Sequence, residues 1–136
     1  MTNTALVFQS RGQARGGISE TISTAAAVTY TVDQMYSGLI KRNPNGAARA
    51  DLLPTGAAMI AGLPGAVVGT LFEFTVKNIS VAAGETITLT PQAGVTTSGT
   101  MTIAITNARR LRIEVTSATP GAEAYTIDSI SQATPF

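Results

Sequence analysis

Apolar and polar residues alternate along most of this 136-residue chain, which is the period of a β-strand with one buried face. The alternation is clearest over residues 70–78, where polar residues separate Phe72, Phe74 and Val76. The same pattern predicts further strands over residues 27–32, 38–42, 86–90, 100–106 and 110–116, and a last strand around Tyr125 and Ile127. The sequence therefore predicts a β-rich domain with an aliphatic core.

Turn residues separate these segments. Asn43-Pro44-Asn45-Gly46 predicts a rigid turn, because proline presets its backbone angle and Asn and Gly tolerate left-handed conformations. Residues 92–99 resemble a loop, and Asn107-Ala108 predicts a tight hairpin between strands 100–106 and 110–116. Strands joined by turns rather than helices favour an antiparallel fold.

One short helix interrupts the strand pattern. Between Leu52 and Leu63 the apolar residues lose their alternation, Pro54 suits a first helical turn, and Gly62 suits an end. The predicted fold class is therefore all-β, an antiparallel β-sandwich or a jelly-roll-like domain with one short helix.

The beginning of the chain lacks a sustained period. Residues 1–22 read as an extended N-terminal arm, in which Leu6, Val7 and Phe8 form an apolar cluster. Either the arm frays or contacts with a neighbouring subunit order it, and we predict the second. Residues 23–136 then form a single β-domain.

Composition indicates how the protein functions as well as how it folds. Charged residues make up 12% of the chain and the net charge is +1, whereas Thr, Ser and Gly are abundant. A neutral, hydroxyl-rich surface costs little to desolvate against a partner, so the composition favours assembly. So weak a net charge does not favour nucleic-acid binding, and without a run of about twenty apolar residues we expect no membrane span.

Candidate chemistry is sparse. The chain has neither His nor Cys, and its carboxylates do not fall at spacings that would pair them on one element. No Asp-x-Asp run resembles a calcium loop. We therefore predict no enzyme activity, no cofactor and no catalytic or metal-binding residues.

The candidate site is instead an interface. Arg42, Arg49 and Asp51 flank the rigid turn, where they form either a local ion pair that pins the turn or a contact between subunits. The basic group around Arg109 begins a strand and suits an interface or a structural role better than a phosphate site. The full set of predicted interface residues is Phe8, Arg11, Arg15, Arg42, Asn43, Asn45, Arg49, Asp51 and Arg109.

Several segments resemble a known family. They are residues 38–54 and 57–61, Leu63-Pro64-Gly65, residues 69–74, Val76-Lys77-Asn78, residues 99–103 and residues 119–125. Together, over roughly Tyr30 to Ile130, the chain resembles small structural proteins of tailed bacteriophages, the capsid decoration or head cement proteins.

The resemblance implies a non-enzymatic β-domain that binds the outer face of an assembled phage head and stabilises the shell. Its expected partners are the major capsid protein and further copies of itself, with a trimer favoured over a dimer, and its expected location is the exterior of the virion. The alternative is a head-fibre or tail-associated module that binds host glycans, although the few aromatic rings fall mostly at inward strand positions.

Overall fold

The structure is a computed structural model that describes residues 18–133, with side chains as far as Ile130. Strands predominate, and both helices are short. The strands are β1 (Glu20–Ile22), β2 (Leu39–Arg42), β3 (Arg49–Leu52), β4 (Leu71–Asn78), β5 (Ile87–Thr90), β6 (Val95–Ser98), β7 (Thr102–Ile103), β8 (Ala108–Ser117) and β9 (Ala124–Ala133). The helices are α1 (Val32–Tyr36) and α2 (Gly56–Ala61).

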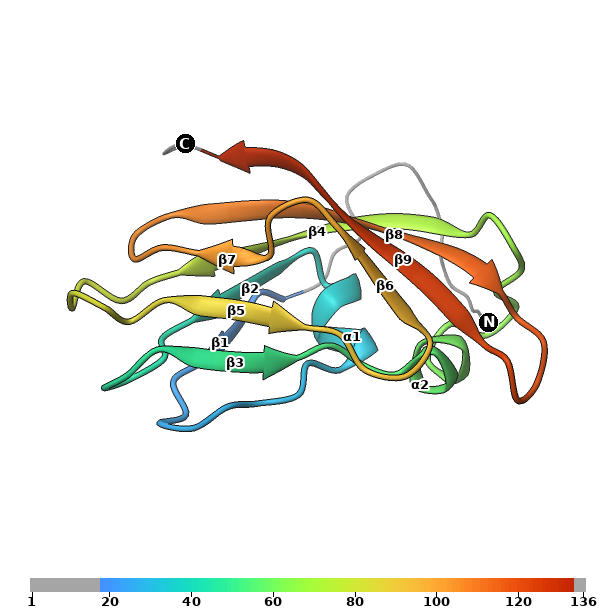
Figure 1. Ribbon diagram of the computed structural model, residues 1–136, viewed down its shortest axis with the longest axis horizontal. Coiled ribbons are helices and arrows are strands. Elements are labelled where there is room, and N and C mark those ends of the chain that lie inside the picture. The colour runs from blue at the N-terminus through green and yellow to red at the C-terminus, as the bar shows by residue number, and fades with distance from the viewer. Residues whose placement is uncertain (1–17, 134–136) are drawn as a thin grey trace.

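The strands form two sheets of mixed orientation (Figure 1). The larger sheet has the order β1-β2-β4-β8-β9-β6, and the smaller has the order β3-β5-β7. The antiparallel pairing expected from the sequence holds for β4–β8, β8–β9 and β5–β7. The pairs β1–β2, β2–β4, β3–β5 and β6–β9 are parallel, so the domain is β-rich without being an antiparallel fold throughout.

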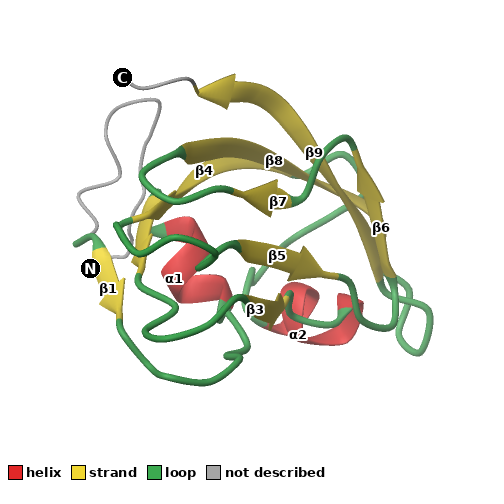
Figure 2. Ribbon diagram, turned by 60° about the vertical axis from the view of Figure 1, so that its left-hand side comes forward, coloured by secondary structure: helices red, strands yellow, loops and turns green. Residues whose placement is uncertain are grey.

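Both sheets face one hydrophobic core. Phe74, Val76 and Leu111 line it from the larger sheet, while Ile87 and Ile103 line it from the smaller one. Figures 1 and 2 show β3 and β5 on one side of this core and β4 and β8 on the other. The burial of Phe72, Phe74 and Val76 confirms the inward face predicted for residues 70–78.

The strand predicted over residues 27–32 is wrong. Thr29 forms only an isolated bridge with Leu52, and the chain then turns into α1 at Val32. Thr31 caps the helix, since its hydroxyl accepts from the Gln34 N–H and the Gln34 side chain accepts from the Thr31 N–H. This capping box decides the local structure in favour of a helix, which buries Val32 and Met35.

The predicted short helix is confirmed as α2. Thr55 caps its N-terminus by accepting from the Ala58 N–H at 3.1 Å, and Gly62 is its C-cap. Pro54 lies just before the cap rather than in the first turn. Met59 is fully buried, so α2 closes one end of the core.

Two further sequence predictions are wrong, one in its strand pairing and one in its secondary structure. The predicted hairpin between residues 100–106 and 110–116 does not form, because β7 pairs with β5 whereas β8 lies between β4 and β9. Residues 92–99, expected as a loop, contain β6, which pairs in parallel with β9.

The predicted N-terminal arm falls mostly outside the described residues. Its last residues, Glu20–Ile22, form β1 at one edge of the larger sheet. Within the described part of the chain, no helix is long and apolar enough to cross a membrane.

Candidate functional site

The residues singled out around the Asn43-Pro44-Asn45-Gly46 turn meet at a buried ion pair. Arg42 ends β2 and Asp51 lies in β3, so the pair joins the larger sheet to the smaller one. Arg42 Nε lies 2.7 Å from Asp51 Oδ2, and Nη2 lies 3.1 Å from Oδ1. Both side chains are fully buried, and the two parallel bonds are the strong form of an Arg–carboxylate contact.

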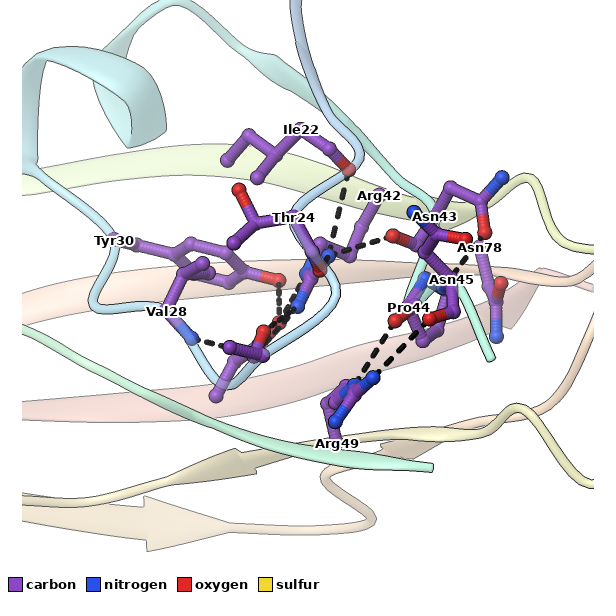
Figure 3. A network of polar contacts seen from close by, with 12 residues as sticks. Ile22, Thr24, Val28, Tyr30, Arg42, Asn43, Pro44, Asn45, Arg49 and Asn78 are labelled. Atoms are coloured by element: carbon purple, nitrogen blue, oxygen red, sulfur yellow. Dashed lines mark hydrogen bonds and ion pairs between the residues drawn. The ribbon is translucent and has the colours of Figure 1, made fainter. Parts of the chain in front are cut away.

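The remaining donors of Arg42 bind backbone carbonyls, two in the chain that follows β1 and one directly after β2 (Figure 3). Nη1 donates to the carbonyls of Thr24 at 3.0 Å and Asn43 at 2.6 Å, and Nη2 donates to the carbonyl of Ala26 at 2.7 Å. The guanidinium thereby holds residues 24–26 against β2 and β3. These residues form no regular strand pairing with either strand.

The carboxylate of Asp51 is equally well satisfied. Besides both bonds from Arg42, Oδ2 accepts from the Tyr30 hydroxyl at 2.9 Å, and Oδ1 accepts from the Val28 N–H at 3.1 Å. Burial, followed by the nearby negative charge of Asp51, raises the pKa of Tyr30 well above its ordinary value. Tyr30 therefore stays neutral and keeps donating far into the alkaline range.

The turn beside this network is fixed by its own hydrogen bonds. Asn45 and Gly46 both have positive φ, 56° and 104°, as the sequence predicted. The Asn43 side chain accepts from the Asn45 N–H at 2.9 Å, and Arg49 Nε donates to the Pro44 carbonyl at 2.9 Å. The Gly46 N–H donates to Glu85 Oε2 at 2.7 Å, which ties the turn to the loop before β5.

Apart from Arg109, the predicted interface residues fall into three groups. Arg42 and Asp51 lie inside the domain, bound to each other, so the local ion pair is the alternative that the structure shows for them. Asn45 is exposed, and Asn43 and Arg49 are half-buried at the surface of the turn. The third group, Phe8, Arg11 and Arg15, lies outside the described residues.

Arg109 is a second tie between the sheets. Only 8% of it is exposed, and its Nε and Nη2 donate to the Thr102 carbonyl on the outer edge of β7 at 3.2 and 2.9 Å. Nη1 donates to the Ser129 hydroxyl at 3.0 Å, and burial lowers the pKa of Arg109. Its role in the single chain is to close the edge of the smaller sheet.

Sequence reasoning missed another buried polar residue, Asn78. Its side-chain amide donates to the carbonyls of Glu85 at 2.8 Å and Ile103 at 3.2 Å, and its oxygen accepts from the Ser80 N–H at 3.0 Å. The only signal was its place at the end of a strand, on the face of Phe74 and Val76. A polar residue in phase with core residues suggests a satisfied internal hydrogen-bonding role.

Charge is distributed unevenly between the outer faces of the two sheets. The outward residues of the larger sheet include Lys41, Glu73, Lys77, Arg110, Arg112, Glu114 and Asp128. Loose ion pairs join Arg110 to Glu73 at 3.9 Å and Arg112 to Asp128 at 3.8 Å. The outward strand residues of the smaller sheet are Ala50, Leu52, Thr88, Thr90 and Thr102, all uncharged.

The described residues hold no group of three or more His, Cys, Asp or Glu side chains that could bind a metal ion. Comparison of the chain with protein-family models, with curated proteins and with solved structures finds no match.

Proposed function

We propose that this chain is a virion structural protein that binds the outer face of an assembled phage head and stabilises the shell. The proposal starts from the resemblance of residues 30–130 to capsid decoration proteins. The observation that carries it is the contrast between the charged outer face of the larger sheet and the uncharged outer face of the smaller one.

An uncharged face is the better docking surface. Charged side chains are depleted from the cores of protein interfaces, because each buried charge must lose its water. Thr88 and Thr102 lie side by side on the smaller sheet with their hydroxyl oxygens 3.2 Å apart, so they already share a hydrogen bond across the strands. In the proposed complex this face, which we call the threonine face (Ala50, Leu52, Thr88, Thr90 and Thr102), contacts the major capsid protein.

The charged face has the complementary task. Its residues alternate in sign, as between Arg112 and the flanking Glu73 and Asp128, and such a mixed surface stays hydrated. On a decorated shell this face points to solvent, and it limits further stacking of copies.

The buried ties give the docking surface a fixed shape. Arg42–Asp51 and Arg109 each join the two sheets, so the threonine face is held on a rigid support. The turn at residues 43–49 borders β3, and its exposed Asn45 would add a polar contact at the rim. A homo-oligomer, with a trimer favoured, would multiply modest contacts per copy through avidity.

Cosedimentation with empty mature capsids that lack the protein tests the proposal. We expect saturable binding with a defined copy number per shell, and no binding to unassembled capsid protein at the same concentration. Failure to bind shells would refute the proposal, and retention on a panel of host glycans would then favour the alternative of a host-binding module.

A further inference from the structure

Three large apolar side chains are presented together at one corner of the domain. Val67, Val68 and Leu71 are 63%, 66% and 55% exposed, and we call them the apolar corner. Clustered exposed apolar residues on a soluble domain mark contact sites far more often than single ones do. Within the part of the chain that the structure describes, these side chains remain uncovered.

The apolar corner is held rigidly. The Gly69 N–H donates to the Val115 carbonyl at 2.8 Å, and the Thr70 N–H donates to the Val67 carbonyl at 3.0 Å. The Thr70 hydroxyl also accepts from the Val67 N–H at 2.9 Å. The turn is therefore pinned to β8, and its side chains need little further ordering when they are covered.

The N-terminal segment enters the fold from the same end of the sheet. β1, β2 and β4 run parallel, and Glu20 is in register with Ile40 and through it with Val76. Leu71 begins β4, five residues earlier, so residues 18 and 19, which lead into β1, lie toward the side of the apolar corner. Figure 1 shows both β1 and β4 running from right to left, away from that end.

Simple distances show that the segment before Glu20 is long enough to reach the corner. The distance from Glu20 to Leu71 is about 17 Å along the strands and about 10 Å across two strand spacings, which together give roughly 20 Å. Twelve residues separate Phe8 from Glu20, and extended chain of that length spans up to about 40 Å. Roughly 20 Å of reach is left for crossing to a neighbouring molecule.

We propose that the apolar corner is the docking site for Leu6-Val7-Phe8 of a second copy of this chain. This sequence is the apolar cluster of the predicted arm, and it matches the corner in character and size. Because the start of β1 and the corner face the same end of each molecule, copies that meet there can exchange arms, reciprocally in a dimer or cyclically in a trimer, and each contact is repeated by symmetry. The inference rests on the proposed function only because it assumes that copies of the chain assemble with one another.

The absence of cysteine from the sequence allows a direct test by disulfide crosslinking. The full-length variants Phe8→Cys and Val68→Cys, one carrying a mass tag, are mixed and oxidised without any shell present. Val81→Cys is the matched control, since Val81 is also an exposed valine between strands, 82% exposed, but follows the far end of β4. We expect the yield of the 8–68 heterodimer to exceed that of the 8–81 heterodimer by about tenfold, which is the ratio produced by a tenfold preference in binding affinity.

Equal yields of the two heterodimers would overturn the inference. So would a crosslink that forms only within one molecule of the double variant Phe8→Cys/Val68→Cys, because the occupant would then be the chain's own arm. Since no shell is involved, either result leaves shell binding as a separate question.

Self-association supplies an independent readout. Val68→Asp places a charge in the proposed contact, and we expect it to weaken self-association by about tenfold or more in sedimentation equilibrium, whereas Val81→Asp leaves it unchanged. Circular dichroism would check that both variants are folded. A wild-type chain that is monomeric at all concentrations, or equal effects of the two substitutions, would contradict the inference.

Discussion

Arg42 satisfies all five of its N–H groups inside the domain, two on Asp51 and three on backbone carbonyls. Its removal would leave a buried carboxylate without its main counter-charge. We expect Arg42→Met to lower the free energy of unfolding by about 3–5 kcal/mol, measured by urea denaturation.

A matched arginine on the surface provides the control. Arg110 is about half exposed and lies 3.9 Å from Glu73, so Arg110→Met is expected to cost less than about 1 kcal/mol. The double variant Arg42→Met/Asp51→Asn should lose less than the sum of its single variants, because neither partner is left as a lone charge. Strict additivity would show that the buried pair is not a coupled unit.

Tyr30 makes the free energy of unfolding fall as the pH becomes alkaline. Burial and Asp51 raise the pKa of Tyr30 in the folded state, so its neutral form is favoured by folding. The stability it contributes is complete below the unfolded pKa of about 10 and is lost as pH rises above that value, at about 1.4 kcal/mol per pH unit.

Urea denaturation from pH 8 to pH 11.5 checks this expectation. Tyr30→Phe should be less stable than wild type at pH 8 by about 1–2 kcal/mol, because Asp51 loses a hydrogen bond. Above pH 10 its stability should fall less steeply than that of the wild type. Parallel curves for the two proteins would contradict the assignment.

At the scale of elements, a close backbone approach joins the loop before β6 to the start of β9. A Cβ atom on Gly94 would lie 2.5 Å from the Glu123 carbonyl oxygen, whereas one on Gly84 would meet nothing within 4 Å. Both glycines have nearly the same positive φ, 81° and 85°. Their comparison therefore isolates steric contact from backbone strain.

We expect Gly84→Ala to cost about 1 kcal/mol, which is the penalty of a left-handed residue with a side chain. Gly94→Ala should cost about 1–3 kcal/mol more, because the backbone around β6 must shift. Thermal unfolding of the two variants under identical conditions measures the difference. Equal losses would show that this contact does not constrain the fold.

The elements that could be predicted are those whose signal is local. The alternation around Phe72 and Phe74, the helix closed by Gly62 and the turn at Asn45 each depend on neighbouring residues, and the structure confirms them. The α1 helix was missed because its capping residues, Thr31 and Gln34, fall within and beside a β-like alternation.

Pairing depends on partners that lie far away in the sequence. The parallel pairs β1–β2, β3–β5 and β6–β9 join segments that are far apart in the sequence, and α1, the helix that connects β1 to β2, was itself not predicted. β6, with the sequence Val-Thr-Thr-Ser, has too few apolar residues to show a period and becomes a strand only beside β9. Local propensity therefore identified many segments as strands without giving their order.

At the scale of the whole molecule, the sequence indicated the character of the surface but not its distribution. Low overall charge suggested assembly, and Arg42 with Asp51 was predicted as either an ion pair or an interface contact. Only the fold shows that this pair is internal and that charge gathers outside the larger sheet. Burial and sheet faces are set by tertiary packing, which residue spacing alone does not determine.

The most direct test of the proposed function asks which face meets the shell. Thr102→Lys adds a charge to the threonine face, and Thr116→Lys adds the same charge to the outer face of the larger sheet; both threonines are exposed strand residues. Cosedimentation with empty mature capsids would compare them with the wild type. We predict that Thr102→Lys weakens shell binding by about tenfold or more while Thr116→Lys binds like the wild type, since only the first buries a charge. Equal binding by both variants, or selective loss with Thr116→Lys, would contradict docking through the threonine face.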